Sequence, residues 1–156
     1  MKTKAKRSVQ SPNPLAAFWD TSGIVPLCCF QPLTAQARQA ARAYGRQIVW
    51  WGSAIEAISS LNRLVRDGHL TVKDSKSAFV RLDYLRRRWH ELQPTDEVRE
   101  LSERLLSRQK FRAADALQLA AALIWCHDRP RERCFIGADN ALSEAAEAEG
   151  FVVIRL

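Results

Sequence analysis

The sequence predicts an α/β fold, with helices on both faces of a mainly parallel central sheet in a three-layer α/β/α arrangement. Short apolar runs, typical of strands buried on both faces, alternate along the chain with segments whose apolar residues recur at helical spacing. This alternation is the pattern of parallel strands joined by crossover helices. The 156 residues are enough for one domain with a sizeable core.

In the first half of the chain, an apolar run over 15–19 predicts a buried strand that stops at the polar loop Asp20-Thr21-Ser22-Gly23. An Ala- and Arg-rich stretch over 34–44 predicts a helix, because Gly45 can close it, and the apolar run over 47–51 predicts the next strand. Apolar residues three or four positions apart then predict two helices, over 54–65 and 73–89.

The second half begins with a weak strand over 91–93 and a helix that starts at 95–97 and keeps its apolar period to Leu105. The stretch 111–123 is apolar on almost every side and carries one carboxylate, Asp115, so we expect it to be a helix inside the domain. The remaining elements are a buried strand, a helix stopped by Gly150 and a final strand, at 134–137, 140–149 and 151–154.

Residues 1–14 are expected to form a disordered basic tail ahead of a single domain over 15–156. Four of the seven net positive charges lie in this tail, on Lys2, Lys4, Lys6 and Arg7. A basic balance favours a polyanionic partner, although a role in solubility or a tag remnant explains the tail equally well. No apolar run approaches the roughly 20 residues that span a bilayer, and no long apolar region follows the basic start, so we expect no secretory signal and a cytoplasmic protein without membrane contact.

The cysteines and histidines show no pattern of a metal or catalytic motif. The four cysteines lack C-x-x-C spacing and have apolar neighbours, which predicts small core residues in a reducing compartment: Cys28, Cys29, Cys126 and Cys134. The histidines have no partner motif, so we expect surface or boundary positions and no histidine acid/base nuclease: His69, His90 and His127.

Four carboxylates are predicted to converge beyond the carboxyl ends of the strands. Asp20 and Asp139 follow strands directly, Glu56 lies one turn past a strand, and Asp115 begins the buried helix. In a parallel sheet these ends share one edge, where ligands bind. No Lys or Arg is fixed among the four by a motif, so their repulsion would raise their pKa values unless a cation entered. Oxygen ligands at this density suit Mg²⁺ or Mn²⁺.

Three of these carboxylates also have a purely structural interpretation. Asp115 falls in a first helical turn, where backbone N–H groups and the macrodipole favour negative charge. Glu56 could complete a capping box with Ser53. Either Asp139 or Asn140 could be no more than an N-cap. Taken singly, these residues do not decide between the two interpretations.

The four carboxylates lie within four short motifs. In chain order these are Phe18-Trp19-Asp20-Thr21-Ser22, Ile55-Glu56, Arg112-Ala113-Ala114-Asp115-Ala116-Leu117-Gln118-Leu119-Ala120 and Phe135-Ile136-Gly137-Ala138-Asp139. Together the motifs resemble the PIN domain, specifically the VapC-type toxin ribonucleases of bacterial and archaeal toxin–antitoxin modules. The resemblance covers residues 15–156.

The resemblance implies a metal-dependent endoribonuclease. Its acidic residues hold one or two divalent ions, Mg²⁺ or Mn²⁺, that activate water for attack on an RNA phosphodiester and leave 5′-phosphate and 3′-hydroxyl ends. These catalytic and metal-binding roles pass to Asp20, Glu56, Asp115 and Asp139. The last is the least typical match, because Gly137 stands where the family often has Thr or Ser. Ser22 matches a hydroxyl that often supports the first Asp, and Arg112 matches a common basic residue.

The resemblance also implies two protein partners, and two other functions compete with it. The partners are a cognate antitoxin, whose C-terminal segment covers the acidic crevice, and a second copy of the chain in a homodimer. One competing function is a catalytically inactive, PIN-like module that binds nucleic acid. The other is a doubly wound phosphatase with Asp20 as nucleophile, which is disfavoured because haloacid-dehalogenase-like enzymes have a second Asp where Ser22 stands.

Overall fold

The computed structural model describes residues 15–110 and 112–156, so the predicted basic tail lies outside the described residues. The described strands are β1 (Ala16–Trp19), β2 (Arg46–Trp50), β3 (His90–Leu92), β4 (Cys134–Gly137) and β5 (Val152–Arg155). The described helices are α1 (Thr21–Cys28), α2 (Thr34–Ala43), α3 (Ser53–Arg66), α4 (Val72–Arg86), α5 (Asp96–Arg108), α6 (Ala113–Trp125) and α7 (Asn140–Glu149).

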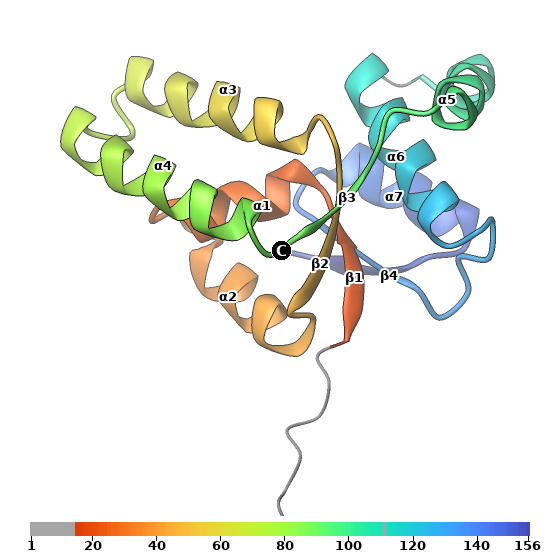
Figure 1. Ribbon diagram of the computed structural model, residues 1–156, viewed down its shortest axis with the longest axis horizontal. Coiled ribbons are helices and arrows are strands. Elements are labelled where there is room, and N and C mark those ends of the chain that lie inside the picture. The colour runs from red at the N-terminus through yellow and green to blue at the C-terminus, as the bar shows by residue number, and fades with distance from the viewer. Residues whose placement is uncertain (1–14, 111) are drawn as a thin grey trace, which may run out of the picture.

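All neighbouring strands in the sheet are parallel, in the order β3-β2-β1-β4-β5. The central strand β1 pairs Phe18 with Ile48 of β2 and with Phe135 of β4. Figure 1 shows this sheet between two groups of helices. The predicted α/β fold with a three-layer arrangement and a parallel sheet is therefore confirmed.

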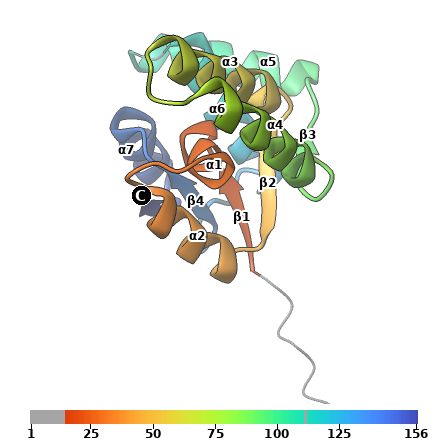
Figure 2. The same ribbon diagram turned by 90° about the vertical axis from the view of Figure 1, so that its left-hand side faces the viewer.

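The two faces of the sheet bury separate cores, because successive side chains of a strand point to opposite faces. Ala17 and Trp19 pack among residues of α1 to α4, the group that faces the viewer in Figure 2. Phe18 packs among residues of α5, α6 and α7, and its ring stacks on that of Phe135 with centroids 5.4 Å apart. Because both faces are covered, the edge at the carboxyl ends of the strands is left for a site.

The predicted polar loop at Asp20–Gly23 is wrong, because the chain enters helix α1 directly after β1. Gly23 and Pro26 both disfavour a helix interior, which hides this element in the sequence. Tertiary packing outweighs that local preference, because seven of the eight residues of α1 are buried. The hydroxyl of Thr34 donates to the carbonyl oxygen of Pro26 at 2.9 Å, so this buried carbonyl has a hydrogen-bond partner.

The helix predicted over 73–89 is three residues too long at its end, because α4 stops at Arg86. Its predicted apolar face is correct in α4, where Ala78, Leu82 and Leu85 are buried. Trp89 is also buried, but it lies beyond the helix, and its indole Nε1 donates to Glu91 Oε1 at 2.9 Å. The Trp89 side chain therefore belongs to the core on this face of the sheet, although the helix has already ended.

The cysteines lie where the sequence predicts them, with Cys28 and Cys126 buried and Cys29 and Cys134 half-buried, and all four are free thiols. The three histidines are exposed, as expected. None of the helices in residues 15–110 and 112–156 has the length and apolar character needed to cross a membrane.

We predict that Phe135→Ala lowers the free energy of unfolding by about 3–5 kcal/mol, because it removes a fully buried ring from the stack with Phe18. The matched control is Val152→Ala in the neighbouring strand, where the side chain is 51% exposed and the cost is expected to stay below about 1 kcal/mol. Urea denaturation of both variants measures the difference, and equal losses would contradict this assignment of the core.

Candidate active site

A cavity of about 310 Å³ opens beyond the carboxyl ends of β1 and β4. All four predicted carboxylates line it: Asp20, Glu56, Asp115 and Asp139. They come from four separate parts of the chain, and the fold brings them together at one edge of the sheet. We refer to this cavity as the acidic crevice.

Asp20 and Asp139 are neighbours because β1 and β4 pair side by side. The Asp20 N–H donates to the Ile136 carbonyl oxygen at 2.9 Å, which continues the ladder past the end of β1. Gly137 lies at the point of closest approach, where a Cβ would make tight contacts, at 3.1 Å to Asp20 Cβ and 3.2 Å to Asp20 Oδ2. The residue that departs from the family pattern therefore makes room for the Asp20 carboxylate.

Ser22 connects the Asp20 carboxylate to the backbone that follows β4. Its hydroxyl donates to Asp20 Oδ2 and accepts from the N–H groups of Ala138, at 2.7 Å, and Asp139, at 3.2 Å. One donor and two acceptor positions are all that a hydroxyl offers, so its capacity is fully used. This arrangement agrees with the support for the first Asp that the resemblance implies for Ser22.

Glu56 is held by Gln118, and the predicted capping box with Ser53 is wrong. The N-cap of α3 is Gly52, and it makes no side-chain cap hydrogen bond, while Ser53 lies inside the helix with a buried, unpartnered hydroxyl. Gln118 Nε2 instead donates to Glu56 Oε2 at 3.1 Å and to Thr21 Oγ1 at 3.0 Å. Glu56 is thus oriented toward the acidic crevice from the opposite wall.

Gln118 is a site residue that the sequence analysis missed. It is 2% exposed and lines the acidic crevice, and its Oε1 is buried without a hydrogen-bond partner. A single glutamine in an apolar helix does not by itself indicate a functional site. Gln118 follows Asp115 by three positions, however, which places both residues on one helix face. That spacing is the signal that could have identified it.

For Asp115 and Asp139 the structural interpretation is correct, and both residues also line the acidic crevice. Asp139 is the N-cap of α7 and accepts from the Leu142 N–H at 2.8 Å. Asp115 lies in the first turn of α6, next to the N-cap residue Arg112. A carboxylate that caps a helix here also presents its negative charge to the crevice, so the two interpretations are compatible.

Burial and repulsion from neighbouring carboxylates raise the pKa values of Asp20, Glu56 and Asp115. Burial raises the pKa of Asp20 to about 6, against the lowering effect of the hydrogen bonds from Ser22. Burial, with repulsion from Asp20 and Asp115, raises the pKa of Glu56 to about 7. The pKa of Asp115 is raised by burial and by Asp139, while Arg112 lowers it. The crevice therefore resists carrying its full negative charge without a cation.

No ion pair neutralises the crevice within the described residues, where the salt bridges are Arg99–Asp96 and Arg155–Glu147. The donor set consists of carboxylate, hydroxyl and amide oxygens, which suits a hard divalent cation. Across residues 15–110 and 112–156, however, no three His, Cys, Asp or Glu side chains form a group that could hold a metal ion. The donors fit such an ion by chemistry, whereas a compact set of protein ligands is not preformed.

Comparisons with known proteins support the fold. No protein-family model matches the chain, and no curated protein matches it. Among solved structures, the crystal structure of PAE2754 from Pyrobaculum aerophilum is similar, with a TM-score of 0.55 and 18% sequence identity over 89% of each chain. At this identity the similarity extends to the fold alone.

We predict that, without metal, the contribution of Glu56 to the free energy of unfolding decreases as the pH rises. The pKa of Glu56 is higher in the folded chain, at about 7, than its ordinary 4.5, so the folded state binds this proton more tightly. The resulting stability is fully present below about pH 4.5 and is lost as the pH rises through about 7. Glu56→Gln removes this loss, so its melting temperature relative to wild type should be higher at about pH 8 than at about pH 5.

Thermal melts of both proteins in EDTA measure this difference. The hydrogen bond from Gln118 favours the ionised carboxylate, and the folded pKa of about 7 already includes this effect. If the difference in melting temperature between Glu56→Gln and wild type is the same at both pH values, Glu56 has the same pKa in the folded and unfolded chains, which contradicts the prediction.

Proposed function

We propose that this protein is a metal-dependent endoribonuclease that hydrolyses RNA phosphodiester bonds in the acidic crevice. The observation that carries the proposal is the convergence of four carboxylates on one cavity, without an ion-pair partner among the described residues and with raised pKa values at Asp20, Glu56 and Asp115. The proposal extends to a cytoplasmic toxin of a type II toxin–antitoxin module, with an antitoxin over the crevice and a second copy in a homodimer, as the family resemblance implies.

Mg²⁺ or Mn²⁺ would be held by Asp20, Glu56, Asp115 and Asp139. Mg²⁺ commonly keeps several waters and is bound through only one or two carboxylates, so spaced carboxylates are compatible with it. When bound, the cation supplies Lewis-acid activation of water and neutralises charge on the phosphoryl oxygens.

The remaining residues position these ligands and the substrate. Ser22 fixes the Asp20 carboxylate, and Gln118 fixes Glu56, so two ligands keep their orientation before substrate arrives. Arg63 lines the crevice and Arg112 lies beside Asp115, where guanidinium groups can bind RNA phosphates. No side-chain nucleophile is needed for this chemistry.

A second candidate is a module that binds nucleic acid without cleaving it. It is favoured by the lack, in the described part of the chain, of three acidic or metal-binding side chains grouped to hold an ion. Metal-dependent cleavage by the purified protein separates the two candidates.

We predict that RNA cleavage requires Mg²⁺ or Mn²⁺, because the acidic crevice offers no other electrophile for a phosphoryl group. The measurement is cleavage of a labelled single-stranded RNA with either ion, with excess EDTA, and after the ion is restored. Asp20→Asn protein purified in parallel controls for contaminating nucleases. Cleavage that persists in EDTA, above the level of that control, would contradict a metal-dependent mechanism.

We predict that Asp115→Asn separates the capping role from metal binding. Without metal its melting temperature should be unchanged or higher, because repulsion with Glu56 and Asp139 is relieved. Mg²⁺ should raise the melting temperature of wild type much more than that of the variant, since stabilisation follows RT ln(1 + [L]/Kd). Cleavage should fall by orders of magnitude.

The matched control for this variant is Asp74→Asn. Asp74 is the third residue of α4, as Asp115 is of α6, but it lies away from the acidic crevice. It should keep full cleavage and the full gain from Mg²⁺, with stability lowered by no more than about 1 kcal/mol. If Asp115→Asn behaves like this control, Asp115 has no part in metal binding.

A further inference from the structure

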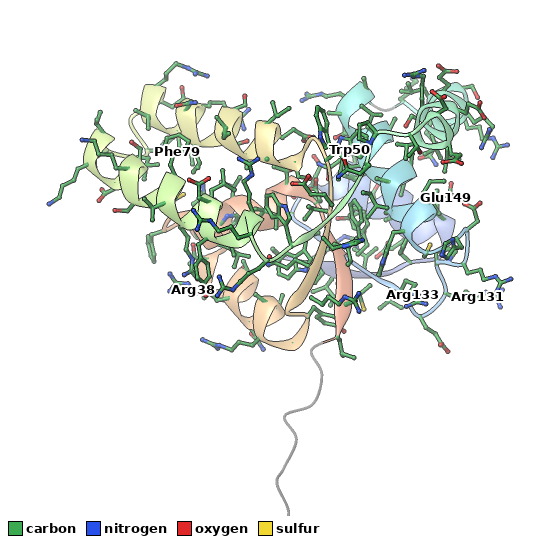
Figure 3. The ribbon with its side chains drawn as sticks, viewed as in Figure 1. Arg38, Trp50, Phe79, Arg131, Arg133 and Glu149 are labelled. Atoms are coloured by element: carbon green, nitrogen blue, oxygen red, sulfur yellow. The ribbon has the colours of Figure 1, made fainter. Side chains whose placement is uncertain are left out.

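Three arginines line a second cavity, of about 300 Å³, in the gap between α2 and α4. They are Arg38 and Arg42 of α2 and Arg81 of α4, and all three are exposed. Buried side chains also line this cavity, among them Leu27 of α1 and Leu85 of α4. We refer to it as the arginine cavity; Figure 3 labels Arg38 on the side of the molecule that carries α2 and α4.

Among the described residues, no ion pair balances the positive charge of the arginine cavity. Arg81 lies over the Tyr84 ring, 5.2 Å from its centroid, and Arg38 also lines a neighbouring cavity that contains Asp74. No carboxylate is among its lining residues, and the ion pairs of the described chain involve none of the three arginines. Residues 1–14 and 111 contain no Asp or Glu that could pair with them. Arg38 and Arg42 are also four positions apart on one helix face, where like charges repel. An anion bound between them would relieve this repulsion.

The arginine cavity is separate from the acidic crevice. Gln47 lines it near the amino end of β2, whereas the crevice lies beyond the carboxyl ends of the strands. No residue lines both cavities. The arginines therefore do not neutralise the crevice carboxylates, and their ligand is independent of the proposed ribonuclease chemistry.

We propose that the arginine cavity binds a phosphoryl group. A guanidinium group presents a planar set of N–H donors that matches two phosphoryl oxygens at once, and three such groups match an anion with several oxygens and more than one charge. The phosphoryl group belongs either to a small phosphate compound or to the backbone of a nucleic acid.

The test is binding in EDTA, which also prevents metal-dependent cleavage, with two probes. The probes are inorganic phosphate and a short single-stranded RNA with hydroxyl groups at both ends, so that it carries only backbone phosphates. Each of Arg38→Gln, Arg42→Gln and Arg81→Gln should weaken binding roughly tenfold, the effect of one lost charge-assisted hydrogen bond. With RNA, each should also lower the salt slope by about 0.7.

Two controls make the result specific to this cavity. Arg104→Gln removes an exposed arginine of α5 outside the cavity and should leave binding within about twofold of wild type. Arg81→Lys keeps the charge but not the planar donor set, so it should bind more weakly than wild type while folding normally. Because both probes are measured in EDTA and neither measurement needs cleavage, failure of the ribonuclease proposal does not affect this test.

The two probes identify the source of the phosphoryl group. Binding of phosphate that the cavity variants weaken supports a site for a small phosphate compound, and such binding of RNA alone supports a backbone site. If wild type binds neither probe, or if the three glutamine variants bind like Arg104→Gln, the proposal is overturned.

Discussion

The site depends on keeping the buried carboxylate of Asp20 at the edge of the sheet, largely withdrawn from water. Asp20 is only 4% exposed, and loss of hydration is the main reason for its raised pKa. Burying a carboxylate is tolerable only when hydrogen bonds replace the lost water, and Ser22 supplies them from both its hydroxyl and its backbone N–H. The absence of a side chain at Gly137 leaves the space that this arrangement occupies.

Helix N-termini provide the second source of stabilisation, and they unite the structural and functional interpretations of the carboxylates. Asp20 and Asp139 are N-caps of α1 and α7, and Glu56 and Asp115 lie in the first turns of α3 and α6. Four helices therefore direct their partial positive charges toward one crevice, which favours carboxylates there. The same N–H groups and dipoles favour bound phosphate, so they stabilise the apo protein and remain useful when an anionic substrate arrives.

The sequence allowed the sheet, most helices and the four carboxylates to be predicted, because each rests on local periodicity and on the rule that parallel strands end at a common edge. What it could not show depends on contacts between distant segments. Helix α1 forms despite Gly23 and Pro26 because its burial outweighs their propensities. Gln118 contacts Thr21 and Glu56, which are 97 and 62 positions away, so its role emerges only where helices from the two faces of the sheet meet at the acidic crevice.

The two ends of the sheet carry opposite charge, which constrains how a polyanion can approach the protein. No residue lines both the arginine cavity and the acidic crevice, so the two charged regions occupy different parts of the surface. An RNA phosphate nearing the metal-free crevice meets repulsion from its carboxylates, which Arg63, Arg112 and the helix N-termini offset only in part. A bound divalent cation would neutralise this negative charge and attract the phosphate. Under the proposed function, cation binding therefore governs the entry of substrate as well as its hydrolysis.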